Sequence, residues 1–377
     1  MLEMENGGKD IRQRNKKRVL DYIFRNRKAT KQQLVDALDM SLPTVLQNVK
    51  ELSREGLIAT DGYMDSTGGR KAAAITPIPQ VRFAVGVEIA RQSVTLVLVD
   101  LCGDVQRFAQ QRFPFAWEDA YFQALDAMIQ EFVRESGVSE QRVLGVGFAL
   151  PGPVSHGQHT ITSSITLNAY NAPTAPFARS VPYPCAFVHD ADAAGHSEAH
   201  ARQDLRSFVY LHLSHLVGGT VVVDGEPFCG VHNRSGEFGH MRLYPHGKTC
   251  YCGNDGCADP YLSADVLAQG MENGLSGFFA RLEAADPACV QRWHEYLDSL
   301  VILVNNLNMV FDNPVVLGGA VGAFLTPWMA EINRRASAIN LFADGDYVYP
   351  CASGPHAAAL GAALMHIDRF FRQYPNR

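Results

Sequence analysis

Three cysteines and one histidine stand close together in the second half of this chain and could form a metal site. The four side chains are His240, Cys250, Cys252 and Cys257. Zn²⁺ prefers four nitrogen and sulfur ligands in a tetrahedron, and a Cys3His set fills all four positions. Gly253 and Gly256 allow the tight turns that would bring the thiolates together. We therefore expect a structural zinc ion here.

The alternative is that these cysteines are reduced thiols in a loop, as we expect for the scattered ones: Cys102, Cys185, Cys229, Cys289 and Cys351. A C-x-C-x4-C cluster with an upstream histidine is much more specific for zinc than isolated cysteines are. A disulfide is a weaker explanation. The sequence has neither a signal peptide nor an extracellular cysteine framework, so a reducing cytosol fits better.

His240 also ends the segment Gly236-Glu-Phe-Gly-His240. A metal bound to this histidine would brace a Glu237/His240 pair that could face a polyol. For Glu237 by itself, the alternative is a solvated carboxylate in a loop.

Length, composition and charge indicate a soluble protein of two or three domains with a small basic head. The chain has 377 residues, of which 47% are hydrophobic and 19% charged. No apolar run approaches the roughly 20 residues that span a bilayer, and we expect a cytoplasmic protein without membrane contact. The net charge of −6 divides into +4 for residues 1–80 and −10 for the rest. Only the head is therefore expected to meet a polyanion.

Residues 12–76 have the pattern of a winged helix-turn-helix domain. Apolar residues at helical spacing predict a helix over 14–26. A Thr-x-x-Gln capping box at Thr30 begins a second helix, and Ser41 can cap a third, which Gly56 stops. Two helices, a short turn and a third helix follow the order of the helix-turn-helix.

The residues after Gly56 predict a wing with a basic tip. A strand at 57–60 and an apolar run at 72–75 flank a polar turn that ends in Gly-Gly-Arg-Lys. Glutamine and asparagine can read adenine edges, serine, threonine and lysine suit phosphates, and arginine can enter a narrow minor groove. We expect DNA contacts from the third helix and the wing: Ser41, Thr44, Gln47, Asn48, Lys50, Arg70 and Lys71. The alternatives are a three-helix bundle with solvated polar residues or a protein-binding winged helix.

The rest of the chain alternates strands with helices, which predicts a two-lobed α/β body with a cleft between the lobes. After a stiff linker at 77–82, we place lobe 1 at 83–195 and lobe 2, with the cysteine cluster, at 196–356. A C-terminal helix at about 357–374 belongs to lobe 1. The expected strands are 83–89, 93–100, 143–150, 186–190, 208–213, 219–224 and 315–319, and the expected helices are 117–136, 191–202 and 325–341.

The body resembles the ROK family (repressors, open reading frames and sugar kinases) over essentially all of residues 83–370. The most specific match is Gly-Glu-Phe-Gly-His at 236–240 followed by Cys-x-Cys-Gly-x-x-Gly-Cys at 250–257. The segments at 149–154, 190–194 and 316–319 match as well. With a winged helix in front, the chain looks like a ROK transcriptional regulator similar to the xylose- and N-acetylglucosamine-type repressors. The resemblance implies an actin-like, hexokinase-like double fold with Zn²⁺ at the four residues named above.

The resemblance also implies an effector site for a sugar. In the family's sugar kinases an aspartate at the position of Asp190 is the general base, and residues matching Glu237 and His240 bind other hydroxyls. The alternative for Asp190 is a helix N-cap. Two neighbours depart from the pattern, since His189 replaces an asparagine and Asp259 a glutamate. We expect effector contacts from these five residues, and His189 could favour a phosphorylated or other anionic sugar.

Both phosphate loops of the family are degenerate here. Its Asp-x-Gly-Gly-Thr loop reads Glu-Ile-Ala-Arg-Gln at 88–92, and its Gly-Thr-Gly-x-Gly loop reads Ser-His-Leu-Val-Gly at 214–218. Phosphoryl transfer needs small residues and free backbone amides around the phosphates. We therefore expect no enzyme activity and consider Asp190 a vestigial base.

These observations predict a sugar-responsive repressor that binds operator DNA as a homodimer or tetramer, because two heads read two half-sites. The main alternative is an ATP-dependent sugar kinase with a regulatory DNA-binding head. A third possibility is an adaptor whose head binds a partner protein.

Overall fold

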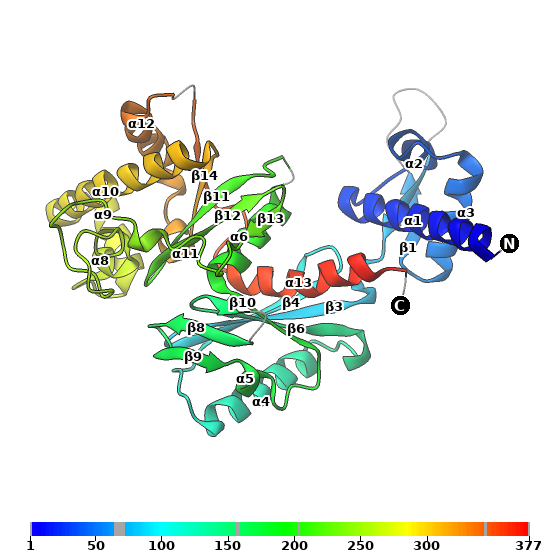
Figure 1. Cartoon of the computed structure of the whole chain (residues 1–377), viewed down its shortest axis with the longest axis horizontal. Helices are drawn as coiled ribbons and strands as arrows, with labels where there is room; N and C mark the ends of the chain where they lie inside the picture. The colour runs from blue at the N-terminus through cyan, green and yellow to red at the C-terminus, as the bar shows by residue number, and fades with distance from the viewer. Residues whose placement is uncertain (1, 64–71, 156–158, 203, 343–344, 376–377) are drawn as a thin grey trace.

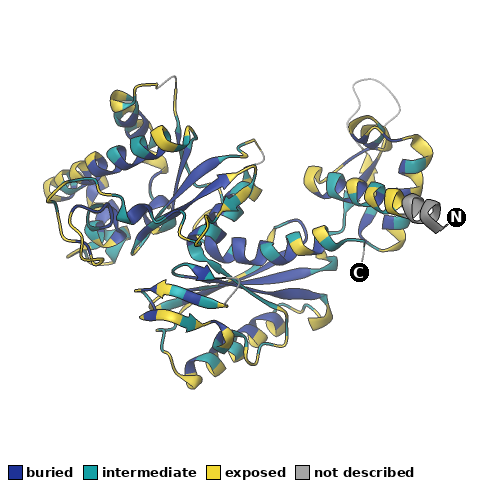
Figure 2. Cartoon of the chain, in the orientation of Figure 1, coloured by how far each residue is buried: buried dark blue, intermediate teal, exposed yellow. Residues whose placement is uncertain are grey.

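The computed structural model describes residues 2–63, 72–155, 159–202, 204–342 and 345–375, without the side chains of residues 2–9. A small helical head lies at one end of the molecule, and a body of two α/β lobes makes up the rest (Figure 1). Buried residues follow the strands of both lobes, while exposed residues cover the outer helices (Figure 2). None of the helices in these described ranges is both long and apolar enough to cross a membrane.

The head has the predicted three helices and wing. Its elements are α1 (Leu2–Asn26), α2 (Lys31–Leu38), α3 (Leu42–Arg54), β1 (Ile58–Tyr63) and β2 (Ala73–Pro77). The Thr30 hydroxyl accepts the Gln33 amide at 3.1 Å while the Gln33 side chain accepts the Thr30 amide at 2.8 Å, which confirms the capping box. Ser41 caps α3. Helix α1 begins twelve residues before the predicted start. The prediction missed this first part because it is mostly polar and carries no apolar stripe.

The wing is an antiparallel pair in which Ile58 lies opposite Pro77. Its tip falls in residues 64–71, so Arg70 and Lys71 lie outside the described residues. The segment predicted as a linker contains the 3-10 turn η1 (Pro79–Val81). The amide of Ile78 donates to Leu57 of the head, and the amide of Leu101 in lobe 1 donates to Pro79.

Lobe 1 is built on a five-stranded sheet in the order β10-β6-β3-β4-β5. Its strands are β3 (Phe83–Ile89), β4 (Ser93–Asp100), β5 (Val105–Arg112), β6 (Val143–Leu150) and β10 (Cys185–His189). Alternation along β3 sends Phe83, Val85 and Val87 into the core shared with α4 (Asp119–Glu135) and Ala84 into the core on the other face. The smaller elements are η2 (Glu140–Arg142), β7 (Val154–Ser155), β8 (Thr160–Ser164), β9 (Ala169–Pro173) and α5 (Ala175–Ala178).

The last helix, α13 (Ala357–Gln373), packs very closely on the second face of this sheet. A Cβ at Gly86 would lie 1.8 Å from the carbonyl oxygen of Ala359, and one at Gly147 would lie 2.0 Å from that of Ala362. Only glycine permits this approach at both strands. Further along, α13 reaches the head, where the rings of Phe24 and Phe371 pack edge to face at 5.1 Å.

Lobe 2 has a second five-stranded sheet in the order β13-β12-β11-β14-β15. Its strands are β11 (Phe208–Leu213), β12 (Val217–Val223), β13 (Glu226–Phe228), β14 (Val315–Gly318) and β15 (Val348–Pro350). The hairpin expected at 208–213 and 219–224 is confirmed as β11 and β12. The other elements are η3 (Phe238–His240), α7 (Asp259–Leu262), α8 (Ala264–Ala268), α9 (Gly274–Glu283), α10 (Pro287–Phe311), α11 (Gly319–Gly322), η4 (Thr326–Trp328) and α12 (Met329–Ile339).

Helix α6 (Asp190–Ala201) joins the two lobes. It packs on α13 from lobe 1 and on β12 from lobe 2. Glu198 of α6 is fully buried and accepts hydrogen bonds from the backbone amides of Ala352 and Ser353 and from the Arg202 side chain. Burial opposes ionisation, but these hydrogen bonds hold the pKa of Glu198 below its ordinary value. The charged carboxylate therefore ties α6 to the segment through which the chain leaves lobe 2.

Candidate effector site and metal cluster

The four predicted metal ligands lie together in a compact loop, residues 240–257, which we call the knuckle. It leaves η3, reverses direction and returns to α7, with a backbone bridge between Arg242 and Cys257. The backbone has positive φ at Gly253 and Gly256. A Cβ at Gly256 would lie 1.7 Å from the carbonyl oxygen of Tyr244, so this turn requires glycine.

The ligand atoms of the cluster all lie within 4.8 Å of one another. The Cys250 sulfur is 3.8 Å from His240 Nδ1, and the Cys252 sulfur is 3.8 Å from that of Cys257. All eight cysteines are free thiols, so no disulfide competes for these sulfurs. Three sulfurs and one imidazole nitrogen on a closed loop match the donor set of a structural zinc site.

His240 connects the knuckle to a second polar group through the opposite edge of its ring. Its Nδ1 faces the cysteines, whereas its Nε2 lies 3.1 Å from the Tyr251 hydroxyl and 4.0 Å from Glu237 Oε2. Burial, followed by the charges of Asp259 and Glu237, raises the pKa of Tyr251. Sequence reasoning missed Tyr251, although its position between Cys250 and Cys252 could have indicated it.

Asp259 belongs to the same region but is almost fully buried. Its Oδ1 accepts the backbone amide of Val217 at 2.7 Å, and burial raises its pKa. This bond attaches the start of α7 to the start of β12. One oxygen of this predicted sugar ligand therefore already has a protein partner.

Two further predicted effector residues lie where β10 meets α6. His189 is the N-cap residue of α6, without a side-chain cap, and Asp190 is its first residue. Asp190 Oδ1 lies 3.2 Å from His189 Nε2 and accepts the amide of Ala191 at 2.7 Å. The alternative in which Asp190 itself caps the helix is therefore wrong, because the chain enters the helix one residue earlier.

Glu88, at the end of β3, faces Asp190 across this corner. Burial, with a smaller contribution from the negative charge of Asp190, raises the pKa of Glu88 from 4.5 to about 7. The negative charge of Asp190 therefore adds to the effect of burial and makes ionisation of Glu88 still less favourable. Sequence reasoning considered Glu88 only as part of a degenerate phosphate loop.

This contact predicts a pH-dependent effect of Glu88→Gln on stability. Because the folded protein holds the proton of Glu88 more tightly than the unfolded chain does, the stabilisation is complete below pH 4.5 and is lost as the pH rises through about 7. Glutamine stays neutral. We expect the variant to gain roughly 2 kcal/mol in free energy of unfolding at pH 8 and almost nothing at pH 4.

Urea unfolding at the two pH values measures this difference. The exposed Glu226→Gln variant is the control and should show no such change between pH 4 and pH 8. Equal stability of Glu88→Gln and wild type at pH 8 would show that Glu88 is not held in an unfavourable charged state.

The structure corrects one predicted DNA-contact residue. Ser41, the N-cap of α3, is exposed, as are Gln47 and Lys50 within the helix, and Thr44 is partly exposed. Asn48, however, is 2% exposed and donates to the carbonyl of Thr44 at 2.9 Å. The prediction that Asn48 lies on the outer face is therefore wrong. It belongs to the buried stripe of Val45, Val49 and Leu52, since these positions recur at helical spacing. Two exposed leucines, Leu42 and Leu46, were missed on the outer face.

A cavity of about 440 Å³ lies elsewhere, between the knuckle and α10. It is lined by Tyr244, Lys248, Tyr261 and residues of α10, and it contains none of the predicted effector residues. The predicted effector residues instead form two groups by their contacts, together with Tyr251 and Glu88. One is Glu237, His240, Tyr251 and Asp259 in lobe 2, and the other is Glu88, His189 and Asp190 at the junction of the lobes.

Comparison with known families decides what this architecture is. The ROK family profile matches residues 84–369, and a winged helix-turn-helix DNA-binding profile matches residues 12–59. The chain belongs to the ROK family. It has a two-lobed actin-like body, which follows a winged helix-turn-helix head.

Several ROK relatives are similar over most of the chain. The xylose repressor of Bacillus subtilis (strain 168) is 23% identical over 96% of this chain and 96% of its own length. The DNA-binding transcriptional dual regulator NagC of Escherichia coli (strain K12) is 24% identical over 73% of this chain and 69% of its own length.

Solved structures show the same fold. A ROK family transcriptional regulator described as a homolog of the Escherichia coli MLC protein superposes with a TM-score of 0.72 at 21% identity, covering 95% of this chain and 99% of that one. A ROK family glucokinase from Streptomyces griseus, in complex with glucose and AMPPNP, gives 0.65 at 21% identity over 75% of this chain and 98% of its own.

Proposed function

We propose that the protein is a sugar-responsive DNA-binding transcriptional regulator that acts as a repressor. Two observations together carry the proposal. The head is a winged helix-turn-helix, and in the body His240 belongs to the cluster of four potential metal ligands and also lies next to the carboxylate of Glu237. The similarity to the xylose repressor over nearly the whole chain supports the same conclusion.

In the head, α3 is the recognition helix. Its exposed Gln47 and Lys50 and the partly exposed Thr44 lie on the side away from the buried stripe, and its N-cap Ser41 is also exposed. These residues can contact phosphates and base edges. The wing residues Arg70 and Lys71 complete the DNA-contact set.

In the body, a sugar binds between the two groups of polar side chains. Asp190 and His189 approach it from the start of α6, and Glu237 and His240 from lobe 2, with Asp259 behind them. Carboxylates and imidazoles are directional partners for hydroxyls, and a buried hydroxyl left without a partner is costly. Xylose is the first sugar to test, and an amino sugar or a phosphorylated sugar is the next.

A zinc ion bound by His240, Cys250, Cys252 and Cys257 would hold the knuckle in place. Its role would be structural: His240, whose Nδ1 faces the cysteines, would be held by the ion, and its Nε2 would stay on the side of Glu237. Binding of a sugar closes the lobes, moves the heads and weakens operator binding, which requires different sugar affinities in the two states.

The body does not transfer phosphate in this proposal. Arg91 and Gln92 occupy the turn after β3, and the Ser214 hydroxyl already accepts the amide of Ala320 at 3.0 Å. Both features use space or backbone groups that a triphosphate needs. The protein acts in the cytoplasm as a homodimer or tetramer, so that two heads meet two half-sites one helical turn apart.

Binding of the head to DNA can be tested with labelled duplexes that tile the region upstream of the protein's own coding sequence. We expect one duplex to bind specifically in fluorescence anisotropy and to be released by a sugar. Lys50→Ala should weaken binding on all duplexes about equally and lower the salt slope by about one, and Gln47→Ala should cost about 1–3 kcal/mol on the specific duplex.

Lys248→Ala is the matched control, because it removes the same charge from lobe 2. It should bind the duplex as wild type does. If no duplex is bound specifically under any condition, the regulator proposal fails.

A further inference from the structure

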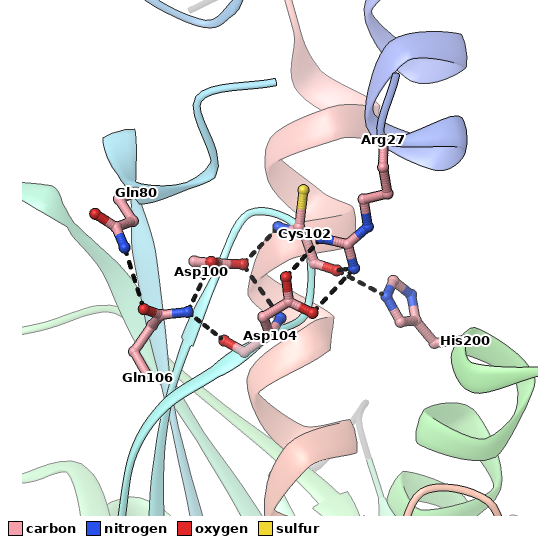
Figure 3. Close-up of polar contacts among 7 residues, drawn as sticks. All are labelled: Arg27, Gln80, Asp100, Cys102, Asp104, Gln106 and His200. Carbon is pink, nitrogen blue, oxygen red and sulfur yellow. Dashed lines mark hydrogen bonds and ion pairs between the residues drawn. The ribbon is translucent and has the colours of Figure 1, made fainter. Parts of the chain in front are cut away.

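A polar junction connects the head to lobe 1 through Arg27, just beyond α1 (Figure 3). Its guanidinium makes two bonds to the Asp104 carboxylate, at 2.6 and 3.0 Å, and donates to the carbonyl of Cys102 at 2.7 Å. Arg27 has a positive φ of 61°. The chain therefore adopts an unusual backbone conformation at the residue that reaches from the head to the body.

The receiving segment is the turn between β4 and β5, residues 100–104, which we call the Cys102 turn. Asp100 is 2% exposed and organises it from inside, because its Oδ1 accepts the amides of Cys102 at 2.9 Å and Asp104 at 3.1 Å. Its other oxygen accepts from Gln106 at 2.9 Å (Figure 3). A turn held by so many bonds moves as a unit.

The same carbonyl of Cys102 is also approached from the other side by α6. His200, in the last turn of that helix, places Nε2 at 3.3 Å from this oxygen, as Figure 3 shows. A Cβ at Gly103 would lie 2.4 Å from that nitrogen, so the imidazole packs directly on the turn. One backbone oxygen thus receives a side chain of the head and a side chain of α6.

Helix α6 begins at Asp190, in the proposed effector site, and ends beside the Cys102 turn. It has 12 residues and is therefore about 18 Å long. It is held along its length by the Glu198 bonds described above and by a contact of 2.7 Å between His196 Nε2 and the carboxylate of Asp368 on α13. A shift at its first residue is therefore transmitted to His200 as a movement of a rigid element.

We propose that Arg27 and His200, which meet at the Cys102 carbonyl, are the positioning residues through which occupancy of the effector site sets the orientation of the DNA-binding head. This proposal rests on the proposed function. The Arg27–Asp104 pair is largely exposed, with 47% and 56% of the two side chains accessible, and such pairs add little to stability. Its loss leaves the fold intact and removes the coupling.

The first test uses the full-length protein without any sugar. Hydrogen–deuterium exchange should become faster in residues 190–194 of Arg27→Ala and in residues 27–30 of His200→Ala, at least threefold in each case. Arg134→Ala, which breaks an exposed pair with Glu131 on α4, is the control and should change neither segment. A surface pair without a coupling role changes only the amides beside it, so unaltered exchange at the distant segment overturns the proposal.

The second test measures the Kd of the operator duplex with and without D-xylose or N-acetyl-D-glucosamine. Where wild type shows a sugar-dependent change, Arg27→Ala, Asp104→Ala and His200→Ala should each reduce it to less than twofold. The Kd for the sugar alone should stay within about twofold of wild type. The Arg27→Ala/His200→Ala double variant should do no more than either single variant.

Rescue separates positioning from simple damage. Arg27→Lys, which keeps a positive charge and a donor for the Cys102 carbonyl, should retain at least half of the sugar response, whereas Arg27→Asp should remove it. A wild-type-like response in the single variants, or additive effects in the double variant, overturns the proposal. If wild type itself shows no DNA binding or no sugar response, the proposed function fails. The hydrogen–deuterium exchange experiment still decides whether the junction couples residues 27–30 to residues 190–194.

Discussion

Removal of the metal from the knuckle is expected to abolish the sugar response while the head still binds DNA. The ion would be the partner of His240 Nδ1, and without it the ring loses its fixed orientation and Nε2 no longer faces Glu237. Changes in the groups that orient such ligands usually cost 10- to 100-fold in affinity. We expect at least that loss for the sugar, together with a lower Tm, because binding of a structural zinc ion contributes to folding.

The experiment compares as-purified, chelated and Cys257→Ser protein. Elemental analysis should give one zinc per chain in the first and much less in the others, and thermal shift with a sugar panel reports binding. Cys289→Ser is matched for burial, because both thiols are almost fully buried and only Cys257 belongs to the cluster. Wild-type protein that contains no transition metal, or that responds to sugar equally well after chelation, would contradict the proposed role of the cluster.

Asp190→Asn is expected to have the second largest effect. The substitution keeps the size of the side chain but removes the charge that would accept a sugar hydroxyl, and a hydrogen bond to a charged group is worth about 1.5–3 kcal/mol. The Kd for the sugar should rise roughly 10- to 100-fold. Operator binding without sugar should not change, because Asp190 lies in the body and not on α3.

Asp119→Asn is the control for this variant, since Asp119 is also the first residue of a helix in lobe 1 but lies on its exposed surface. Isothermal titration and operator release are the two measurements. An unchanged sugar affinity in Asp190→Asn would remove this residue from the effector site. If wild type phosphorylated a sugar with ATP and the variant did not, the kinase alternative would replace the sensor.

Local sequence signals predicted the parts of the fold that depend on neighbouring residues. The capping box at Thr30, the cap at Ser41 and the knuckle glycines involve only residues that are close in the sequence. Their structural roles could therefore be predicted from the sequence. Asn48 shows where this reasoning was incomplete. The position of Asn48 in the helix was sufficient to place it on the buried stripe, but its polar side chain suggested exposure. Only the structure shows that the side-chain amide of Asn48 donates to the Thr44 carbonyl.

Contacts between distant segments could not be predicted in the same way. Glu88 and Asp190 are about a hundred residues apart, and their proximity depends on how β3, β6 and β10 align in the sheet. The contact of Arg27 with Asp104 depends further on how the head sits on lobe 1. Their residue types are ordinary for exposed loops, so the sequence offers no local signal for either pair.

The position of α13 has a consequence for the order in which the head is completed during synthesis. The buried residues of the head belong to one hydrophobic cluster that also contains residues of lobe 1 and of α13. One of the head's contacts with the body is the packing of Phe24 against Phe371, which is synthesised more than three hundred residues later. A nascent or prematurely terminated chain that lacks α13 would therefore leave part of the head's packing surface exposed to solvent.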